Sequence, residues 1–200
     1  MTTIITVLTE GYADWETALL NAVARSFYGV ETRFATPGGA HVTSSGGLKV
    51  TPDLAVEDID VSAIDALVVN GGSAWSQDDA PDIATVLVAA RDAGKVVAGI
   101  CDATLALAKA GLLDDIEHTS NSAENLPPTG YQGADHYQDQ PSAVVAGKIV
   151  TAPGTAPVSF MAGVMQSLGL RDGNLDYYLG LHAAEHFDPS RRADRSRGAI

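Results

Sequence analysis

Hydrophobic and polar positions change their period repeatedly along this chain, and the changes divide it into strands and helices. Short apolar runs, typical of buried strands, lie at 4–8, 66–70 and 96–100, and further strands are predicted over 30–35 and 144–150. Between them, apolar residues recur at helical spacing, as in the helix that opens near Asp14 with Leu19, Leu20, Val23 and Phe27. Further helices are predicted over 81–93, 103–110 and 157–168. This alternation predicts a mostly parallel sheet with helices on both faces.

Glycine and proline mark the boundaries of these elements. The tripeptide PGG at 37–39 ends the second strand, and the sequence SSGG at 44–47 predicts a hairpin over 41–52. Two hundred residues are enough for one α/β core. We expect one domain over 1–170, followed over 171–200 by a helix and a tail that pack on this core or on a second subunit.

Composition and charge narrow the class of protein. The chain is 46% hydrophobic and 18% charged, as in globular proteins. Its net charge of −13 opposes binding to nucleic acid and to anionic membranes, because phosphate groups would be repelled. No apolar run is long enough for a transmembrane helix, and the N-terminus has no signal-peptide pattern. With a single cysteine and hence no internal disulfide, the chain is expected to be cytoplasmic.

The single cysteine, Cys101, lies where the strand 96–100 meets the helix 103–110. Such a turn holds its side chain at the carboxyl edge of a parallel sheet, where α/β folds place their sites. The following backbone N–H groups belong to a helix N-terminus and would stabilise a thiolate or an oxyanion. The pattern therefore predicts a reactive cysteine. The alternative is a buried structural one, since free cysteine is a common core residue.

A second motif lies near the C-terminus. His182, Glu185 and His186 match the H-x-x-E-H pattern of some zinc peptidases. The match lies among the last 20 residues, where only Asp188 and Asp194 remain as further ligands, so we expect neither a metal nor another cofactor. The pattern instead indicates a terminal helix over 175–187, followed by an arginine-containing tail over 189–200 that is solvated or bound to a partner.

Four segments resemble the DJ-1/PfpI (ThiJ/PfpI) family of the class I glutamine amidotransferase-like superfamily. They are EGYADWET at 10–17, VVNGG at 68–72, AGIC at 98–101 with GLL at 111–113, and TAPGTA at 151–156. The resemblance covers about residues 3 to 170. It implies a flavodoxin-like three-layer sandwich with a nucleophile-elbow cysteine, and a homodimer.

The resemblance also implies roles for individual residues. Cys101 matches the family's nucleophile and Glu16 its neighbouring acid, while the backbone N–H groups of Gly72 and Asp102 match its oxyanion hole. A carboxylate repels a thiolate, so we expect a protonated Glu16 that donates to the Cys101 thiolate. Each position has a structural alternative: a first-turn helix acid at Glu16, a tight turn at Gly72, and a helix cap at Asp102. A further role for the Asp102 side chain is a second acid in the pocket.

The sequence departs from the family where hydrolases of this kind usually have a histidine beside the cysteine. Asp102 follows Cys101 directly, and Asn121 falls at the downstream histidine position. An amide cannot take a proton from a thiol, so peptidase action is not expected. His118 would face the opposite side of a strand from Asn121 and would help only in another register.

Trp15 and Trp75 lie in loops near the predicted site, where they either wall a pocket or pack in the core. We expect an enzyme without a cofactor that acts on a small electrophilic substrate as a hydrolase, hydratase or glyoxalase-like lyase. The alternatives are a redox- or stress-responsive cysteine protein without turnover, or an amidotransferase-like protein that has lost its activity.

Overall fold

A computed structural model describes residues 1–185. Its main sheet has seven strands in the order β5-β2-β1-β6-β7-β9-β8. All neighbouring strands are parallel except the pair β8 and β9. The strands are β1 (Thr3–Val7), β2 (Glu31–Thr36), β5 (Leu54–Ala55), β6 (Ala66–Val69), β7 (Val96–Ile100), β8 (Val144–Ala146) and β9 (Ile149–Ala152). This mostly parallel sheet confirms the predicted fold class.

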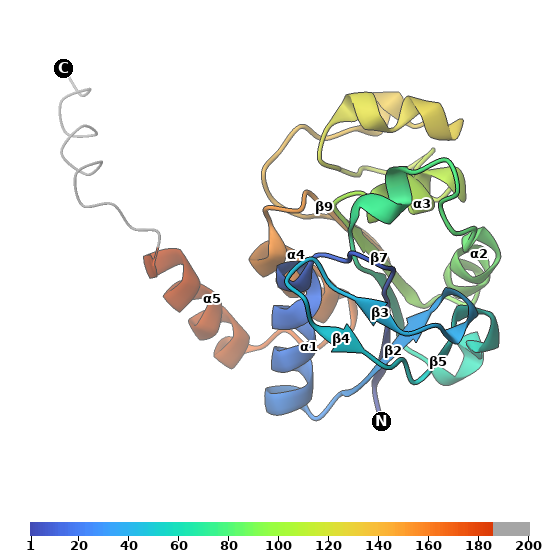
Figure 1. Ribbon diagram of the computed structural model, residues 1–200. Coiled ribbons are helices and arrows are strands. Elements are labelled where there is room, and N and C mark those ends of the chain that lie inside the picture. Colours follow the sequence, from blue (N-terminus) through green and yellow to red (C-terminus); the bar gives the residue numbers. More distant parts are fainter. Residues whose placement is uncertain (186–200) are drawn as a thin grey trace, which may run out of the picture. The chain divides into compact units, whose positions relative to one another are not determined.

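Helices cover both faces of the sheet, which gives three layers (Figure 1). Helices α1 (Asp14–Tyr28) and α4 (Pro157–Ser167) pack together on one face, and α2 (Ala84–Asp92) and α3 (Ala103–Lys109) pack on the other. The chain divides into two compact units, Met1–Leu170 and a second beginning at Arg171. Helix α5 (Gly173–Glu185) belongs to the second unit. The predicted tail at 189–200 lies outside the described residues.

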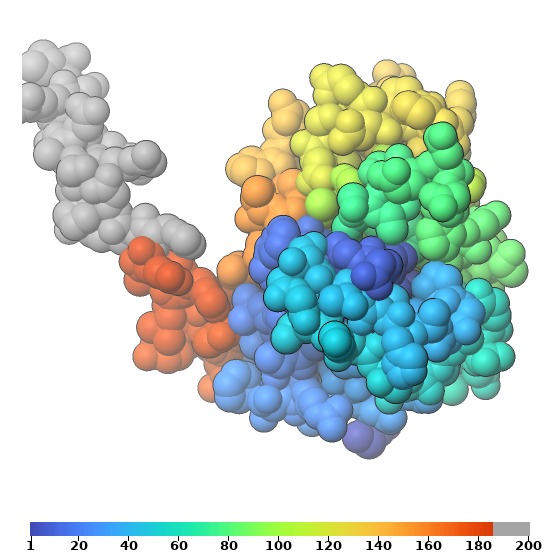
Figure 2. All heavy atoms as spheres, viewed as in Figure 1, coloured from blue at the N-terminus to red at the C-terminus, as the bar shows by residue number. Residues whose placement is uncertain are grey.

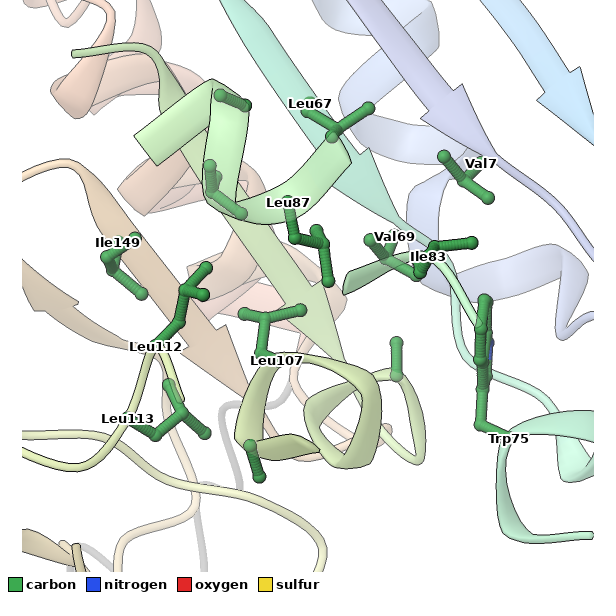
Figure 3. Packing of buried hydrophobic residues seen from close by; sticks show 14 of the residues in the cluster. Val7, Leu67, Val69, Trp75, Ile83, Leu87, Leu107, Leu112, Leu113 and Ile149 are labelled. Atoms are coloured by element: carbon green, nitrogen blue, oxygen red, sulfur yellow. The ribbon is translucent and has the colours of Figure 1, made fainter. Parts of the chain in front are cut away.

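The central strands β6 and β7 are buried throughout and read as short apolar runs, because helices cover both faces of the sheet there. On the α2 and α3 face, Leu87 and Leu107 belong to one buried cluster with Leu67 and Val69 of β6 (Figure 3), and Leu107 lies directly over Gly99 of β7. All four side chains are fully buried. This packing fixes the height of α3 above the sheet, and therefore the position of the turn that joins β7 to α3. Among residues 1–185, no helix is both long and apolar enough to cross a membrane.

The predicted hairpin is present as the antiparallel pair β3 (Val42–Thr43) and β4 (Lys49–Val50). It lies on the surface beside the start of α1 (Figure 2). The backbone N–H of Gly46 donates to Asp14 Oδ2 at 2.7 Å, and the N–H of Ser45 donates to the Tyr12 carbonyl at 2.8 Å. The hairpin therefore braces the loop that leads from β1 into α1.

Three element predictions need correction. The single late strand over 144–150 is two antiparallel strands, β8 and β9, because Gly147 adopts a φ of 62° and reverses the chain. The helix predicted from residue 81 begins at Ala84, whose N–H donates to Asp82 Oδ1 at 3.0 Å. Phe27, assigned to the apolar face of α1, is 71% exposed, because the buried face of that helix is turned toward Leu20 and Val23.

Candidate active site

Cys101 lies in the sharp turn between β7 and α3, at the carboxyl edge of the sheet. Its φ is 60°, and it is the one non-glycine residue with positive φ in the described part of the chain. A left-handed backbone at such a residue costs about 1–3 kcal/mol, so the surroundings must hold it. The Cys101 N–H donates to the Ala152 carbonyl at 2.9 Å, and Thr104 Oγ1 donates to the Cys101 carbonyl at 2.7 Å. These bonds anchor both ends of the residue.

Glu16, in the first turn of α1, is completely buried beside this turn. Its Oε2 accepts the backbone N–H of Gly71 at 2.8 Å, while Oε1 has no hydrogen-bond partner apart from the nearby Cys101 thiol. A Cβ on Gly154 would lie 2.9 Å from Cys101 Sγ and 2.9 Å from Glu16 Oε1. The sulfur and Oε1 are therefore both close to Gly154, and a hydrogen bond between the two side chains contributes to the pKa of each.

Asn121 completes the surroundings of the sulfur. Its Nδ2 donates to Cys101 Sγ at 3.1 Å and to Asp102 Oδ1 at 2.8 Å. Its Oδ1 accepts the backbone N–H of Gly154 at 2.9 Å. On the other side of Gly154, the carbonyl accepts Trp15 Nε1–H at 3.1 Å. An amide therefore lies against the thiol on this side and donates a hydrogen bond to it.

Glu16 and Cys101 titrate together. Burial raises the pKa of Glu16 to about 7, and the nearby charge of Asp102 adds to the rise. Burial also raises the pKa of the Cys101 thiol to about 12, with a contribution from the Glu16 charge, while hydrogen bonds from Asn121 and the Asp102 backbone oppose the rise. Two acids this close do not both ionise readily, so the pair carries one negative charge between these pH values. One proton is then shared between Oε1 and Sγ.

The structure places the Asp102 and Trp75 side chains next to one cavity, but neither has the purely structural role that the sequence offered as an alternative. The Asp102 side chain does not cap α3; it accepts from Asn121 instead. Trp75 is almost fully buried and donates from Nε1 to the Asn70 carbonyl at 2.8 Å. Both residues also line a cavity of about 650 Å³ that extends along α3 to Lys109. Trp75 is thus a core residue with one edge on a cavity next to Asp102.

His118 is not part of this cluster. It is fully buried, its Nδ1 bonds to the Ile116 carbonyl at 2.8 Å and its Nε2 bonds to the Tyr131 hydroxyl at 2.7 Å. Burial lowers the pKa of His118, so the ring is held neutral. Instead of lying on a strand, it forms a single bridge with Tyr137. Both ring nitrogens are engaged by groups away from the cysteine, so the structure does not bring His118 to the sulfur.

The H-x-x-E-H motif falls partly outside the described residues, which end before His186. His182 lies on α5 and packs edge-on against Tyr178, with ring centroids 4.8 Å apart. Within residues 1–185, no cluster of three or more His, Cys, Asp or Glu side chains is arranged to hold a metal ion.

Two glycines of the site were missed by sequence reasoning. We selected Gly72 from the glycine pair, but Gly71 is the one against the cysteine: a Cβ there would collide with Glu16 Oε2 and lie 2.5 Å from Cys101 Cβ. Gly72 has a φ of 151°, and a Cβ on it would lie 3.0 Å from Tyr12 Cα. Gly154 was quoted only as part of the late turn. A glycine that follows a buried strand is the available signal, but it does not say which neighbour comes close.

Comparisons with known proteins agree with this geometry. The DJ-1/PfpI family model matches residues 2–167. The uncharacterized protease YoaZ of Bacillus subtilis is 34% identical over 129 residues, which is 64% of this chain and only 61% of that relative. The uncharacterized protease YdeA of the same organism is 30% identical over 171 residues, 81% of each chain. The structure of the DJ-1 superfamily protein Atu0886 from Agrobacterium tumefaciens is 47% identical, with a TM-score of 0.91 over 94% of this chain and all of that one. The chain therefore belongs to the DJ-1/PfpI family.

Proposed function

We propose that this protein is a cysteine-dependent enzyme that acts on a small electrophilic carbon, such as that of an aldehyde, a 2-oxoaldehyde or an isonitrile. One observation carries the proposal: Cys101 Sγ lies between a donating amide, Asn121 Nδ2, and a buried carboxyl with a free oxygen, Glu16 Oε1. Of the two acids, Glu16 is fully buried, whereas Cys101 is partly exposed and receives hydrogen bonds. Burial raises the pKa of the thiol further than that of the carboxyl, so the charge of the resting pair is mainly on Glu16. We propose that the reactive form is the one in which the shared proton has moved to Glu16 and the hydrogen-bonded sulfur carries the charge.

The first chemical step follows from this charge arrangement. The thiolate attacks the carbonyl carbon, a carbon–sulfur bond forms, and the carbonyl electron pair moves to oxygen. Glu16 gives its proton to that oxygen, which leaves a neutral hemithioacetal and a Glu16 carboxylate. The backbone N–H groups of Asp102 and Gly72 are proposed to bind the developing oxyanion before the proton arrives.

With a 2-oxoaldehyde, the same two residues suffice for the rest of the reaction. The Glu16 carboxylate removes the hydrogen from the former aldehyde carbon as a proton, which leaves an enediolate, and it returns this proton to the neighbouring carbon. The hydroxyl proton on the former aldehyde carbon moves to the oxygen of that neighbouring carbon, which becomes the 2-hydroxyl group. The electron pairs shift to leave a thioester of Cys101, which water hydrolyses to a 2-hydroxy acid and the free thiol. The net reaction adds one water and requires no external oxidant.

Peptide cleavage fits this site less well, although both curated relatives are named proteases. The amine leaving group of a peptide must be protonated, in most cysteine peptidases by a histidine. Here Asn121 lies against the sulfur, and a side-chain amide does not act as a proton donor to a leaving group at neutral pH. We therefore place small electrophiles ahead of peptides as substrates.

The test compares three substrates: methylglyoxal, a simple isonitrile and a fluorogenic peptide. Turnover of a small electrophile that is lost in Cys101→Ser would support the proposal, with Glu10→Gln as a control on an exposed acid away from the sulfur. Cysteine-dependent cleavage of the peptide, with neither small electrophile consumed, would refute it.

A redox-responsive protein without turnover is the second candidate. The observation in its favour is a partly exposed cysteine held as part of a monoanionic pair, a state that peroxide oxidises to sulfenic and then sulfinic acid. No turnover of any electrophile, combined with rapid oxidation of Cys101 by peroxide in intact-mass measurements, would favour this function. The homodimer and the cytoplasmic location remain predictions.

A further inference from the structure

We propose that Trp15 is a positioning residue that controls the ionisation of Cys101 through Gly154 and Asn121, an inference that rests on the proposed function of the thiolate. The connection is a continuous row of hydrogen bonds. Trp15 Nε1–H donates to the Gly154 carbonyl at 3.1 Å, the Gly154 N–H donates to Asn121 Oδ1 at 2.9 Å, and Asn121 Nδ2 donates to Sγ at 3.1 Å.

The orientation of the Asn121 amide decides whether the sulfur meets a donor or an acceptor. Because the Gly154 N–H is a donor, the amide oxygen must face it. The amide nitrogen then faces Cys101 Sγ and Asp102 Oδ1, both of which accept. A flipped amide would set donor against donor at Gly154 and oxygen against sulfur at Cys101. The position of Gly154 therefore specifies that the thiolate receives a hydrogen bond.

Gly154 is in turn placed tightly. A Cβ there would lie 2.9 Å from both Sγ and Glu16 Oε1, so its backbone runs directly over the reactive pair. A shift of the Gly154 backbone would change both its N–H distance to Asn121 Oδ1 and its distance to Cys101 Sγ. Trp15 fixes the carbonyl side of Gly154 across 139 positions of the sequence.

Trp15 is also the neighbour of Glu16 in the first turn of α1. The same turn therefore reaches the sulfur from two sides, directly through Glu16 and indirectly through Trp15. The Trp15 side chain is 57% exposed, so it contributes less to the stability of the fold through burial than a core tryptophan would. Its directional contact with the rest of the site is the indole N–H bond to Gly154. The sequence predicted that Trp15 either lines a pocket or packs in the core. Its hydrogen bond to Gly154 indicates instead that it positions the backbone beside Asn121.

The test removes the indole N–H and keeps an aromatic ring. In Trp15→Phe, the rate of iodoacetamide labelling of Cys101 at neutral pH should fall about three- to tenfold, as expected for one hydrogen bond. The pH at which labelling and ultraviolet thiolate absorbance reach half their plateau should rise. In the Asn121→Ala background, the same change should alter the rate by less than about twofold, because the link to the sulfur is already broken. The unfolding midpoint of each variant shows that the fold is retained.

The outcomes separate this inference from the proposed function. If the wild type labels quickly with an acidic midpoint but Trp15→Phe behaves identically, the positioning role is refuted and the thiolate remains. If Trp15→Phe slows labelling equally with and without Asn121, the effect does not pass through the amide and the inference is overturned. A wild-type Cys101 that labels slowly at all accessible pH values would instead refute the reactive thiolate itself.

Discussion

Replacing Glu16 by glutamine should stabilise the fold at neutral pH. The glutamine amide has the same shape as the carboxyl group, and its oxygen can keep the hydrogen bond from the Gly71 N–H. It does not ionise, however, so the pair that Glu16 forms with Cys101 need not carry a buried negative charge at neutral pH. The proposed catalytic role of Glu16 and the stability of the fold are therefore in conflict.

The magnitude follows from the pKa. Burial raises the pKa of Glu16 from 4.5 to about 7, and each pH unit corresponds to about 1.4 kcal/mol. The folded pair holds its proton more tightly than the unfolded chain, so the contribution to stability is full below pH 4.5 and is lost as pH rises through about 7. The total loss is about 3 kcal/mol. The pH dependence of stability depends only on the number of protons bound in the folded and unfolded states. The loss of about 3 kcal/mol is therefore the same whether the remaining proton lies on Glu16 or on Cys101.

The assay is urea unfolding of the wild type and Glu16→Gln at about pH 5 and about pH 7. The advantage of the variant should be about 2 kcal/mol larger at the higher pH. Taking the difference between the two proteins cancels the titration of all other groups. Glu10→Gln is the matched control, because Glu10 also accepts one backbone N–H, from Thr43, but is exposed. Parallel loss of stability in the wild type and Glu16→Gln would refute the reasoning.

Four further predictions concern the same region. Because the proposed reactive form has the proton on Glu16 and the charge on sulfur, alkylation of Cys101 by iodoacetamide should accelerate as the pair loses its first proton near pH 7 and then level off; acceleration only toward the thiol pKa of about 12 would contradict this. Asn121→Ala should slow alkylation at neutral pH about tenfold, by removing a hydrogen bond to a charged atom. Gly154→Ala should destabilise the fold by about 1–3 kcal/mol in urea unfolding and slow alkylation, since its methyl group would crowd Sγ. Tyr131→Phe should cost about 1–3 kcal/mol by leaving buried His118 Nε2 without its partner, and an equally large loss of Cys101 reactivity would restore His118 to the site.

Local patterns were sufficient for much of the fold. Buried parallel strands need apolar residues on both faces, so they appear in the sequence as short continuous runs, and the helices between them keep their own period. The same patterns failed at Gly147, because the apolar positions on either side of the turn read as one strand. They failed at Phe27 because helical spacing defines a face without saying how the helix is rotated against its neighbours.

The sequence by itself determined that Cys101 lies in a strand-to-helix turn and that Glu16 belongs to the first turn of a helix, and it predicted Asn121 near the cysteine. These are properties of short segments and of their spacing. Only the tertiary structure decided that Gly71 is the glycine pressed against the cysteine and that Trp15 reaches Asn121 through Gly154. The physical reason is that burial and hydrogen bonds depend on groups brought together from the segments that follow β1, β6, β7 and β9 and from the loop that carries Asn121. The charge of the Glu16 and Cys101 pair is likewise set by their common burial, which neither residue's own segment specifies.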